Sequence, residues 1–435
     1  MRAHLSIRLL VLTFLVSSTS LLAADWPTFL GPDANGRSSE SIRLDWPESG
    51  PPVLWQHEVG DGYSAPSVMG ERVWVFDRVR DRNRLTALDV ASGKTLWTAS
   101  YKTDYEDLYG FSGGPRAVPV IHDRMVYTYG AEGRLRAHDV STGELVWDVD
   151  TTKRYGVVQN FFGVGATPVV DGELLIVMVG GSPPDSPKIS SGTVQGNGTG
   201  LVAFDRKTGE ERWRSSDELA SYATPVITEV AGARRGFAFM RGGLLGFDPA
   251  TGNEQLFFPW RARKLESVNA ATPVVVGDLV LLTESYSLGT VVLRIGAPGS
   301  EPAVVWRDPR RGKSLESHWM TPIHHDGTVY GSSGESRGNA ELRAIELATG
   351  TVKWAKKGLG RSTLIYADGH LLVLTETGVL LLVAADPEGY REIARVDLGE
   401  RLGSPSWNAP VLANGRLFLQ GAKRVVVLDL SKPSG

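Results

Sequence analysis

Side chains able to bind polar ligands recur just before short apolar segments along this chain. They are aromatic rings, amides, an imidazole and charges of both signs. Such groups bind a polar ligand or a peptide when they converge on one surface. The alternative is that they are simply the solvated residues of a wet surface. The candidates are Tyr63, Arg116, Asn160, Phe162, Tyr222, Glu266, Asn269, Glu316, His318, Trp319, Arg361, Trp407 and Asn408.

Two of the candidate carboxylates share a local motif. Leu-Glu-Ser occurs at 265–267 and again at 315–317. Glu266 and Glu316 could therefore bind a cation or act as an acid/base pair. A carboxyl separation of about 5–5.5 Å or 6.5–9.5 Å would suit the two glycosidase geometries. We favour the simpler interpretation that two repeats of the chain share an ancestor.

The histidines do not predict a metal site. His318 precedes a short apolar strand and His324 follows it, so about 20 Å of extended chain separates them. The sequence also has no phosphate-binding loop or dinucleotide fingerprint, and we predict no hydrolase. We therefore assign no catalytic residues and expect no metal ligands.

The elements that would position the candidates form a repeat. Each copy opens with a two-residue step before its first strand, and Thr363-Leu364 fits this template within one interval of double length. Seven steps join Pro66 to Pro410, so the mean period is about 49 residues, close to the roughly 40–50 of a four-stranded propeller blade. The other steps are Ala65-Pro66, Val118-Pro119, Thr167-Pro168, Thr224-Pro225, Thr272-Pro273, Thr321-Pro322 and Ala409-Pro410.

Four copies close with an acidic residue, a Gly and a Trp four residues after the Gly. Asp139, Gly143 and Trp147 are one instance. Gly supplies the positive φ of a tight hairpin, the acid is expected to accept backbone N–H bonds, and the Trp to pack against the next blade. Because the set recurs, we predict structural roles. Further instances start at Asp89, Asp205 and Glu346.

These repeats predict an all-β fold, an eight-bladed β-propeller of four-stranded antiparallel blades. The last copy ends near Leu430 without an outer strand, whereas a spare strand, residues 53–59, precedes the first copy. Pairing the two would close the ring. The propeller would span 53–435, after an irregular lead-in, 25–52, anchored by Trp26 and Phe29. Loops entering the inner strands would then bring the candidates to one mouth of the central channel.

The composition favours an exported protein. Residues 1–24 have a basic start, an apolar core and a small-residue end, which is typical of a cleaved signal peptide. The chain has no cysteine for a disulfide or a lipid anchor, and we expect no transmembrane segment. Net charge is −3 without a basic stripe, so nucleic acid is not an expected partner. We expect a periplasmic or secreted monomer.

One insertion interrupts the third copy. Residues 180–200 are rich in Gly, Pro and hydroxyl side chains and nearly lack apolar ones. The segment is either a solvated loop or a lid or partner-binding loop, because long loops in compact folds are often functional.

The repeat resembles that of pyrroloquinoline-quinone (PQQ)-type β-propellers. The resemblance rests on the APV or TPV opening and the A-x-D-x-x-T-G-x-x-x-W close, as in Ala203 to Trp213. It covers about 53–430, and the family includes quinoprotein alcohol dehydrogenases and the outer-membrane assembly lipoprotein BamB. DWPTFLGPDANG and SHWMTPIHHDGTVYGSSG are similar to exported members from planctomycete-type bacteria.

The resemblance implies the fold more strongly than the function. The dehydrogenases of this family have adjacent cysteines against the cofactor and calcium beside a catalytic aspartate. BamB is anchored through a cysteine. This chain has no cysteine, and its acids do not match those calcium ligands.

We therefore expect a binding or scaffold protein rather than an enzyme. Its polar-aromatic channel mouth would hold a partner protein, peptide or polymer without a cofactor. The alternative is a PQQ- and calcium-dependent quinoprotein dehydrogenase acting on an alcohol or sugar. A third hypothesis is carbohydrate cleavage by Glu266 and Glu316.

Overall fold

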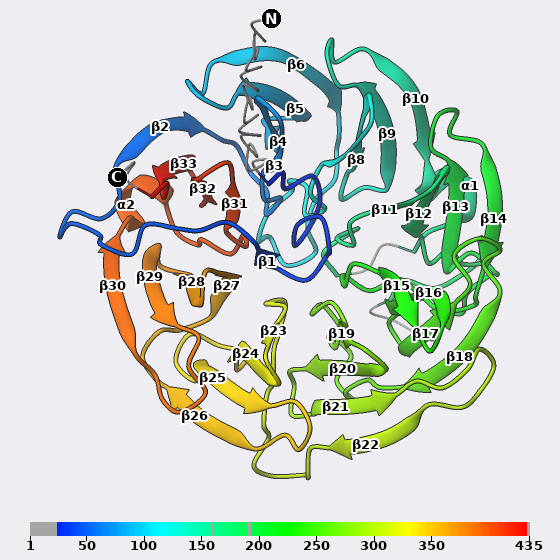
Figure 1. Cartoon of the computed structure of the whole chain (residues 1–435). Coiled ribbons are helices and arrows are strands. Elements are labelled where there is room, and N and C mark those ends of the chain that lie inside the picture. Colours follow the sequence, from blue (N-terminus) through cyan, green and yellow to red (C-terminus); the bar gives the residue numbers. More distant parts are fainter. Residues whose placement is uncertain (1–23, 159–160, 190–192, 433–435) are drawn as a thin grey trace, which may run out of the picture.

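Eight antiparallel sheets surround a central channel in the computed structural model (Figure 1). The structure describes residues 24–158, 161–189 and 193–432. Successive sheets follow the chain around the ring, and each contributes its first strand to the channel wall. The predicted eight-bladed β-propeller is confirmed.

The strands have the following bounds. The N-terminal strands and blades 1 to 4 are β1 Arg37–Ser38, β2 Val53–Glu58, β3 Ser67–Met69, β4 Arg72–Val79, β5 Arg82–Asp89, β6 Thr95–Lys102, β7 Val120–His122, β8 Met125–Tyr129, β9 Arg134–Asp139, β10 Leu145–Asp150, β11 Val169–Asp171, β12 Leu174–Met178, β13 Leu201–Asp205, β14 Glu211–Ser215, β15 Val226–Val230, β16 Ala233–Phe239, β17 Gly243–Phe247 and β18 Glu254–Pro259. Blades 5 to 8 continue with β19 Val274–Val276, β20 Leu279–Glu284, β21 Gly289–Arg294, β22 Ala303–Arg307, β23 Ile323–His325, β24 Thr328–Ser333, β25 Glu341–Glu346, β26 Val352–Lys356, β27 Ser362–Ala367, β28 His370–Thr375, β29 Val379–Ala384, β30 Glu392–Asp397, β31 Val411–Ala413, β32 Arg416–Gln420 and β33 Arg424–Asp429. Two short helices are α1 Thr151–Tyr155 and α2 Gly399–Leu402.

The repeated threonines join neighbouring blades around the channel. The Thr224 N–H donates to Thr272 Oγ1 at 3.1 Å, and the Thr272 N–H donates to Thr321 Oγ1 at 3.0 Å. Val118 and Thr167 donate to the next threonine in the same way, each at 3.2 Å. The Thr-Pro step thus satisfies buried backbone donors that no sheet ladder reaches.

Replacing Thr272 with valine should lower the free energy of unfolding by about 1–3 kcal/mol, because the buried Thr224 N–H loses its acceptor. Urea denaturation would measure this loss. The matched control is Thr98→Val on the exposed outer strand β6, which should change stability by less than about 0.5 kcal/mol. Equal effects of the two variants would show that the hydroxyl does not join the blades.

The repeated Trp and Gly form a second set of links between blades. The Trp147 Nε1–H donates to Arg206 O of blade 3 at 3.1 Å. A Cβ added at Gly209 of that blade would approach the Trp147 ring to 2.8 Å, and Gly209 has φ +73°. Trp97 and Gly143 repeat this contact. The predicted packing of Trp on the next blade is confirmed, and the Gly has both a turn and a packing role.

The acids of the hairpins bind backbone donors as predicted. Asp139 Oδ1 accepts the N–H groups of Ser141 and Thr142 at 2.8 and 3.1 Å. Hydrogen bonds from Ser141 lower the pKa of Asp139 to about 2. The acid therefore stabilises the turn and is not available for chemistry.

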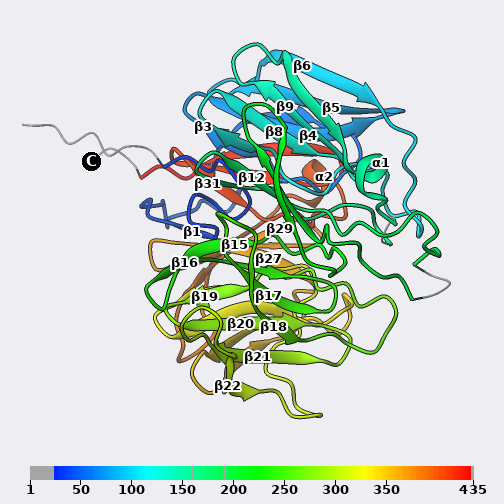
Figure 2. The ribbon, with the colours of Figure 1, turned by 90° about the vertical axis from the view of Figure 1, so that its right-hand side faces the viewer.

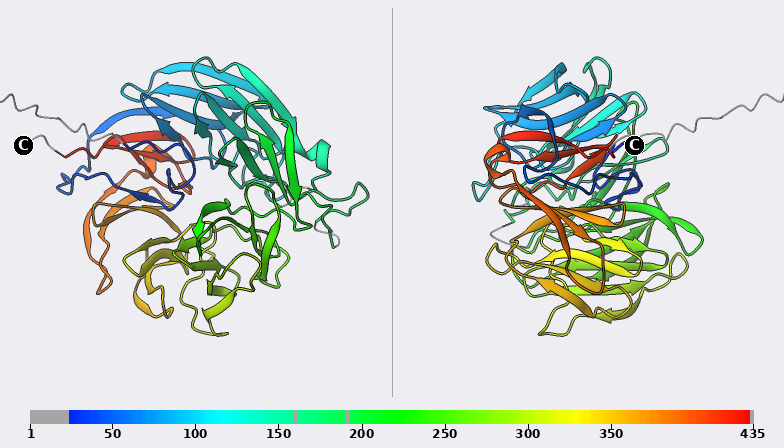
Figure 3. Two further views of the ribbon diagram at one scale, coloured as in Figure 1. Left: turned by 45° about the vertical axis from the view of Figure 1, so that its right-hand side comes forward. Right: turned by 60° about the vertical axis from the view of Figure 1, so that its left-hand side comes forward.

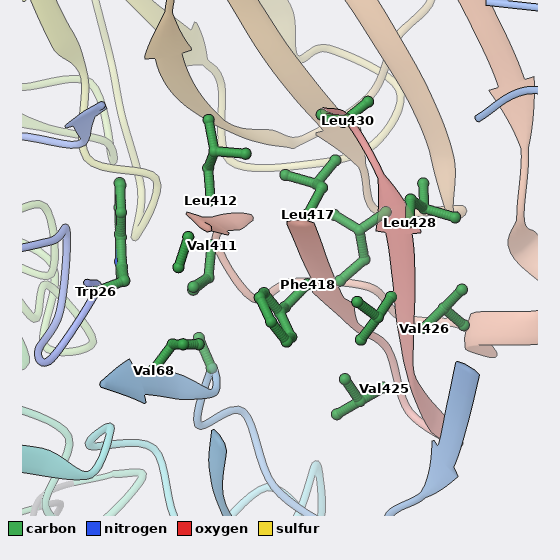
Figure 4. Packing of buried hydrophobic residues seen from close by; sticks show 14 of the residues in the cluster. Trp26, Val68, Val411, Leu412, Leu417, Phe418, Val425, Val426, Leu428 and Leu430 are labelled. Atoms are coloured by element: carbon green, nitrogen blue, oxygen red, sulfur yellow. The ribbon is translucent and has the colours of Figure 1, made fainter. Parts of the chain in front are cut away.

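Strands from both ends of the chain close the ring. β2 pairs with β33 antiparallel, with Trp55 opposite Val427, in a sheet ordered β2-β33-β32-β31. Figure 3 shows this blue strand beside the red C-terminal strands. Their apolar side chains, including Phe418 and Val426, form one core cluster with Trp26 and Val68 of the N-terminal part (Figure 4). The predicted closure is confirmed.

The lead-in crosses the second mouth of the channel, which we define as the end where the inner strands finish. In Figure 2 it lies on one side of the ring. Trp26 exchanges backbone hydrogen bonds with Val68 of blade 1, and Ile121 of blade 2 donates to Pro27 O. The lead-in also contains β1, which pairs in parallel with β27, with Arg37 opposite Tyr366. The sequence predicts an irregular segment here and does not predict β1, because a strand of two residues shows no alternation of side chains.

The insertion of residues 180–200 lies between β12 and β13, as predicted. Its described part runs close to blade 4, since Gly198 N–H donates to Asp217 Oδ1 at 2.7 Å. Among the described residues, no helix has the length and apolar character needed to cross a membrane.

Candidate functional site

A cavity of about 270 Å³ opens at the first mouth, where the inner strands begin. The cavity wall at this mouth comes from loops that enter the inner strands, so residues far apart in sequence meet there. Of the candidate residues, those lining the cavity are Tyr63, Arg116, Phe162, Tyr222, His318, Trp319, Arg361, Trp407 and Asn408.

Aromatic rings make most of the cavity wall. The Trp407 centroid lies 4.9 Å from that of Tyr63 and 4.8 Å from that of Trp319. On the other side, Phe162 lies 5.7 Å from Tyr222, whose hydroxyl accepts the Phe162 N–H at 2.8 Å. Rings at these distances are in mutual contact. They form an apolar wall carried by loops that enter five blades.

Two arginines line the same cavity, each held by a carboxylate outside the lining. Arg361 Nε and Nη2 donate to Glu376 Oε2 at 3.0 and 2.6 Å. The guanidinium also lies 4.8 and 5.1 Å from the Trp319 and Trp407 rings, within cation–π range. Burial raises the pKa of Glu376, but hydrogen bonds from Arg361 outweigh it and leave that pKa below its usual value.

Arg116 holds the loop between β6 and β7. Its Nη2 donates to Asp107 Oδ2 at 2.6 Å and to Ser112 O at 3.0 Å. Its Nη1 donates to Gly114 O at 2.9 Å. The guanidinium therefore fixes the loop that carries Phe111, and Tyr63 OH donates to Phe111 O at 3.2 Å.

His318 is neutral at physiological pH. Burial, with a smaller effect from Arg361, lowers its pKa to about 4. Its Nε2 shares a 2.8 Å hydrogen bond with Tyr286 OH. Its buried Nδ1 and the buried Nε1 of Trp319 have no hydrogen-bond partner among the described residues. Buried polar atoms nearly always have a hydrogen-bond partner, so these two atoms are exceptions.

Three described candidates do not line the cavity. Glu266 is exposed and Glu316 is half-buried. Asn269 is buried, and its Nδ2 donates to three backbone carbonyls, of which Met240 O is nearest at 2.8 Å. Asn269 thus joins blades 4 and 5. Asn160 lies outside the described residues.

The two Leu-Glu-Ser copies are alike in their serines. Ser267 Oγ donates to Glu284 Oε1 at 2.8 Å, and Ser317 Oγ donates to Ser332 O at 3.0 Å. In each case a buried serine joins the inner-strand entry to the second strand of its own blade. This equivalence supports shared ancestry of the two copies.

Sequence reasoning missed several residues of the cavity. Phe111 comes from the β6–β7 loop, and Phe29 and Leu30 come from the lead-in. The available signal was the Leu-Tyr-Gly-Phe run at 108–111, where apolar residues stand outside any strand pattern. Nothing comparable marks Leu30 as a channel residue.

A second, larger cavity of about 710 Å³ opens at the second mouth. His324 lines it, whereas His318 lines the first cavity. The two histidines therefore belong to opposite mouths, as predicted. Phe29 lines both cavities and stands between them.

The quinoprotein alternative requires acidic residues that can hold calcium. The described part of the chain has no cluster of three or more His, Asp or Glu residues suited to a metal ion. The acids nearest the first cavity, Asp107 and Glu376, are already paired with Arg116 and Arg361. These residues do not fit a calcium site, and we derive no quinone-dependent step.

Comparison with known proteins places the chain among propellers of two kinds. The sequence model of the family described as outer membrane protein assembly factor BamB matches residues 46–182 and 81–356. An outer membrane protein assembly factor BamB from Burkholderia pseudomallei is 26% identical over 402 residues, which are 82% of this chain and 95% of that protein. A quinohemoprotein alcohol dehydrogenase from Pseudomonas putida is 29% identical over 110 residues, only 15% of its length.

Solved structures show the same fold. BamB from Moraxella catarrhalis has a TM-score of 0.60 at 16% identity, covering 88% of this chain and 99% of that chain. Quinohemoprotein alcohol dehydrogenase from Comamonas testosteroni has a TM-score of 0.65 at 13% identity, covering 94% and 81%. At such identities the likeness concerns the fold alone.

Proposed function

We propose that this chain, which belongs to the outer membrane protein assembly factor BamB family, binds a partner protein or peptide at the first mouth. The ring is the scaffold, and the loops entering the inner strands provide the contact surface. Binding needs no covalent chemistry and no cofactor. A propeller scaffold with a protein-binding role agrees with the family, and the aromatic cavity supports this choice of surface.

The observation that carries the proposal is an exposed apolar loop beside the cavity. Leu108 and Phe111 are 59% and 58% exposed. The Phe111 ring also lies 6.0 Å from Phe162 and 6.2 Å from Trp407 inside the cavity. Exposed apolar groups that continue into an aromatic pocket are typical of protein-binding sites.

We further propose that the protein works outside the cytoplasm as a monomer. Support comes from the leader-like pattern of residues 1–24 and from the assembly-factor relatives. Residues 1–23 of that leader lie outside the described part of the structure. Periplasmic or secreted location remains part of the proposal.

Replacing Leu108 and Phe111 together with serine should abolish partner capture and leave the melting temperature unchanged, because both side chains are largely exposed. The measurement is affinity capture from a cell-envelope extract of the source organism, quantified by mass spectrometry. The matched control replaces Val304 and Val305, which are exposed on the outer strand β22, with serine as well. A partner that the loop variant still captures, but the β22 variant does not, would contradict the proposal.

A further inference from the structure

Two guanidinium groups and an indole N–H, all of them hydrogen-bond donors without acceptor capacity, line the first cavity. Arg116 and Arg361 face it, while their partners Asp107 and Glu376 do not line it. Trp319 also lines the cavity, and its Nε1–H has no acceptor among the described residues. A ligand that fills this cavity must therefore bring acceptors, and a carboxylate would suit the Arg361 guanidinium.

Arg361 keeps part of its guanidinium free for such a ligand. Its Nε and Nη2 are used by Glu376. No hydrogen bond among the described residues uses its Nη1. The aromatic rings of Trp319 and Trp407 flank the group. A carboxylate bound there would lie beside an apolar aromatic wall.

The cavity has a closed far end. Phe29 and Leu30 of the lead-in line it, and Phe29 also lines the cavity of the second mouth. Trp26, which is 2% exposed, holds this part of the lead-in in the core. With Phe29 between the two cavities, the end of a polypeptide suits the first cavity better than a chain that passes through the channel.

The volume is suited to a small group. About 270 Å³ is below the roughly 300–1,000 Å³ of cavities that hold drug-sized ligands. One large side chain with its terminal carboxylate fits this size class. An N-terminal ammonium group would bring no acceptor for the Trp319 Nε1–H or for Arg361 Nη1.

We propose that the first cavity binds the C-terminal residue of a partner polypeptide, with an aromatic side chain among the rings and its carboxylate on Arg361. The proposal rests on the proposed partner-binding function and specifies which part of the partner enters. Recognition of a terminal carboxylate is a known mode of peptide binding. The exposed loop of Leu108 and Phe111 then contacts the residues that precede the terminus.

Fluorescence anisotropy tests the proposal with labelled glycine–serine decapeptides. One ends in phenylalanine with a free carboxylate, a second is the same peptide amidated, and a third ends in alanine. We expect the first to bind at least tenfold more tightly than the other two. Equal binding of the free and amidated peptides, or no binding of any peptide up to millimolar concentration, would overturn the proposal.

A paired substitution tests the assigned guanidinium. Arg361→Met with Glu376→Gln removes both charges, and the glutamine keeps an acceptor for the residue 361 N–H, which now donates to Glu376 Oε1 at 3.1 Å. Removing both members of a buried pair is often tolerated, and an unchanged melting temperature would verify the fold. The variant should lose at least tenfold affinity for the free-carboxylate peptide and none for the amidated one. Unchanged discrimination between the free and amidated peptides in this variant would overturn the assignment.

Two further results separate the alternatives. Tight binding of N-acetylphenylalanine without binding of the decapeptide would show a free aromatic acid as the ligand and overturn the polypeptide source. If the peptides fail but envelope capture still depends on Leu108 and Phe111, the proposed function stands and this inference falls. If both fail, neither stands.

Discussion

Replacing Glu284 with glutamine should raise the free energy of unfolding at pH 9 by up to about 4–5 kcal/mol and change it far less at pH 5. Glu284 ends β20 and is 2% exposed. Ser267 donates to its Oε1, but its Oε2 has no partner among the described residues. An ionised carboxylate in this position is poorly compensated.

The sign of the effect follows from the pKa of this carboxyl. Burial raises the pKa of Glu284 from 4.5 to about 8; Glu316 and Glu335 add to the rise, and Ser267 and Arg261 oppose it. Between pH 4.5 and 8 the unfolded chain releases this proton while the folded chain keeps it. Stability is therefore fully present below pH 4.5 and is lost as the pH rises through 8. Glutamine removes this dependence.

Urea denaturation at pH 5, 7 and 9 measures the prediction. The matched control is Glu266→Gln, since Glu266 is an exposed carboxylate in the loop that enters the same blade. Its stability should follow that of the unmodified protein at each pH. Parallel pH curves for Glu284→Gln and the unmodified protein would show that Glu284 is already ionised in the fold.

Replacing Trp26 with alanine should cost about 3–5 kcal/mol of unfolding free energy, the range for truncating a large buried side chain. Trp26 is 2% exposed and packs in the cluster of the closing blade (Figure 4). A Cβ at Gly31 would lie 3.2 Å from its ring, so the lead-in folds tightly over it. Losing the ring should also loosen Phe29 and Leu30 at the floor of the first cavity.

Urea denaturation and limited proteolysis of the lead-in measure this prediction. Trp46→Ala is the control, because Trp46 lies in the same lead-in but is only partly buried. The Trp26 variant should unfold at lower urea and be cleaved faster within the lead-in. Similar losses in both variants would mean that Trp26 is not the main anchor.

Local chemistry made the ring predictable. The Thr-Pro step, the hairpin acids and the Gly–Trp spacing act within one blade or between neighbouring blades, so their pattern recurs with the period of the structure. The closing strand was predictable because the last copy lacks an outer strand and residues 53–59 supply one. A blade that is one strand short has an edge that must be paired, so the missing strand can be counted in the sequence.

The loops of the first mouth could be predicted only as a group. Knowing that eight loops converge placed Tyr63, Trp319 and Trp407 together, because all enter inner strands. The same rule also selected Asn269, whose side chain bonds to the backbone of blade 4 instead. Position along a strand determines which mouth a residue reaches, but not the direction of its side chain.

Only the tertiary structure decided which residues complete the first cavity and which carboxyl group is buried. Leu30 reaches the channel because Trp26 is buried against blade 1, and Phe111 reaches it because Arg116 fixes its loop. Glu284, at the end of β20, is buried and accepts a hydrogen bond from Ser267 of the loop that enters the same blade. The lead-in contacts join segments distant in sequence, and the energies of all these contacts depend on distance and burial, which the sequence does not show. The chain by itself determined the repeat and the turns, because those interactions lie within about one period of the sequence, and it determined the closure because the last copy lacks the strand that residues 53–59 supply.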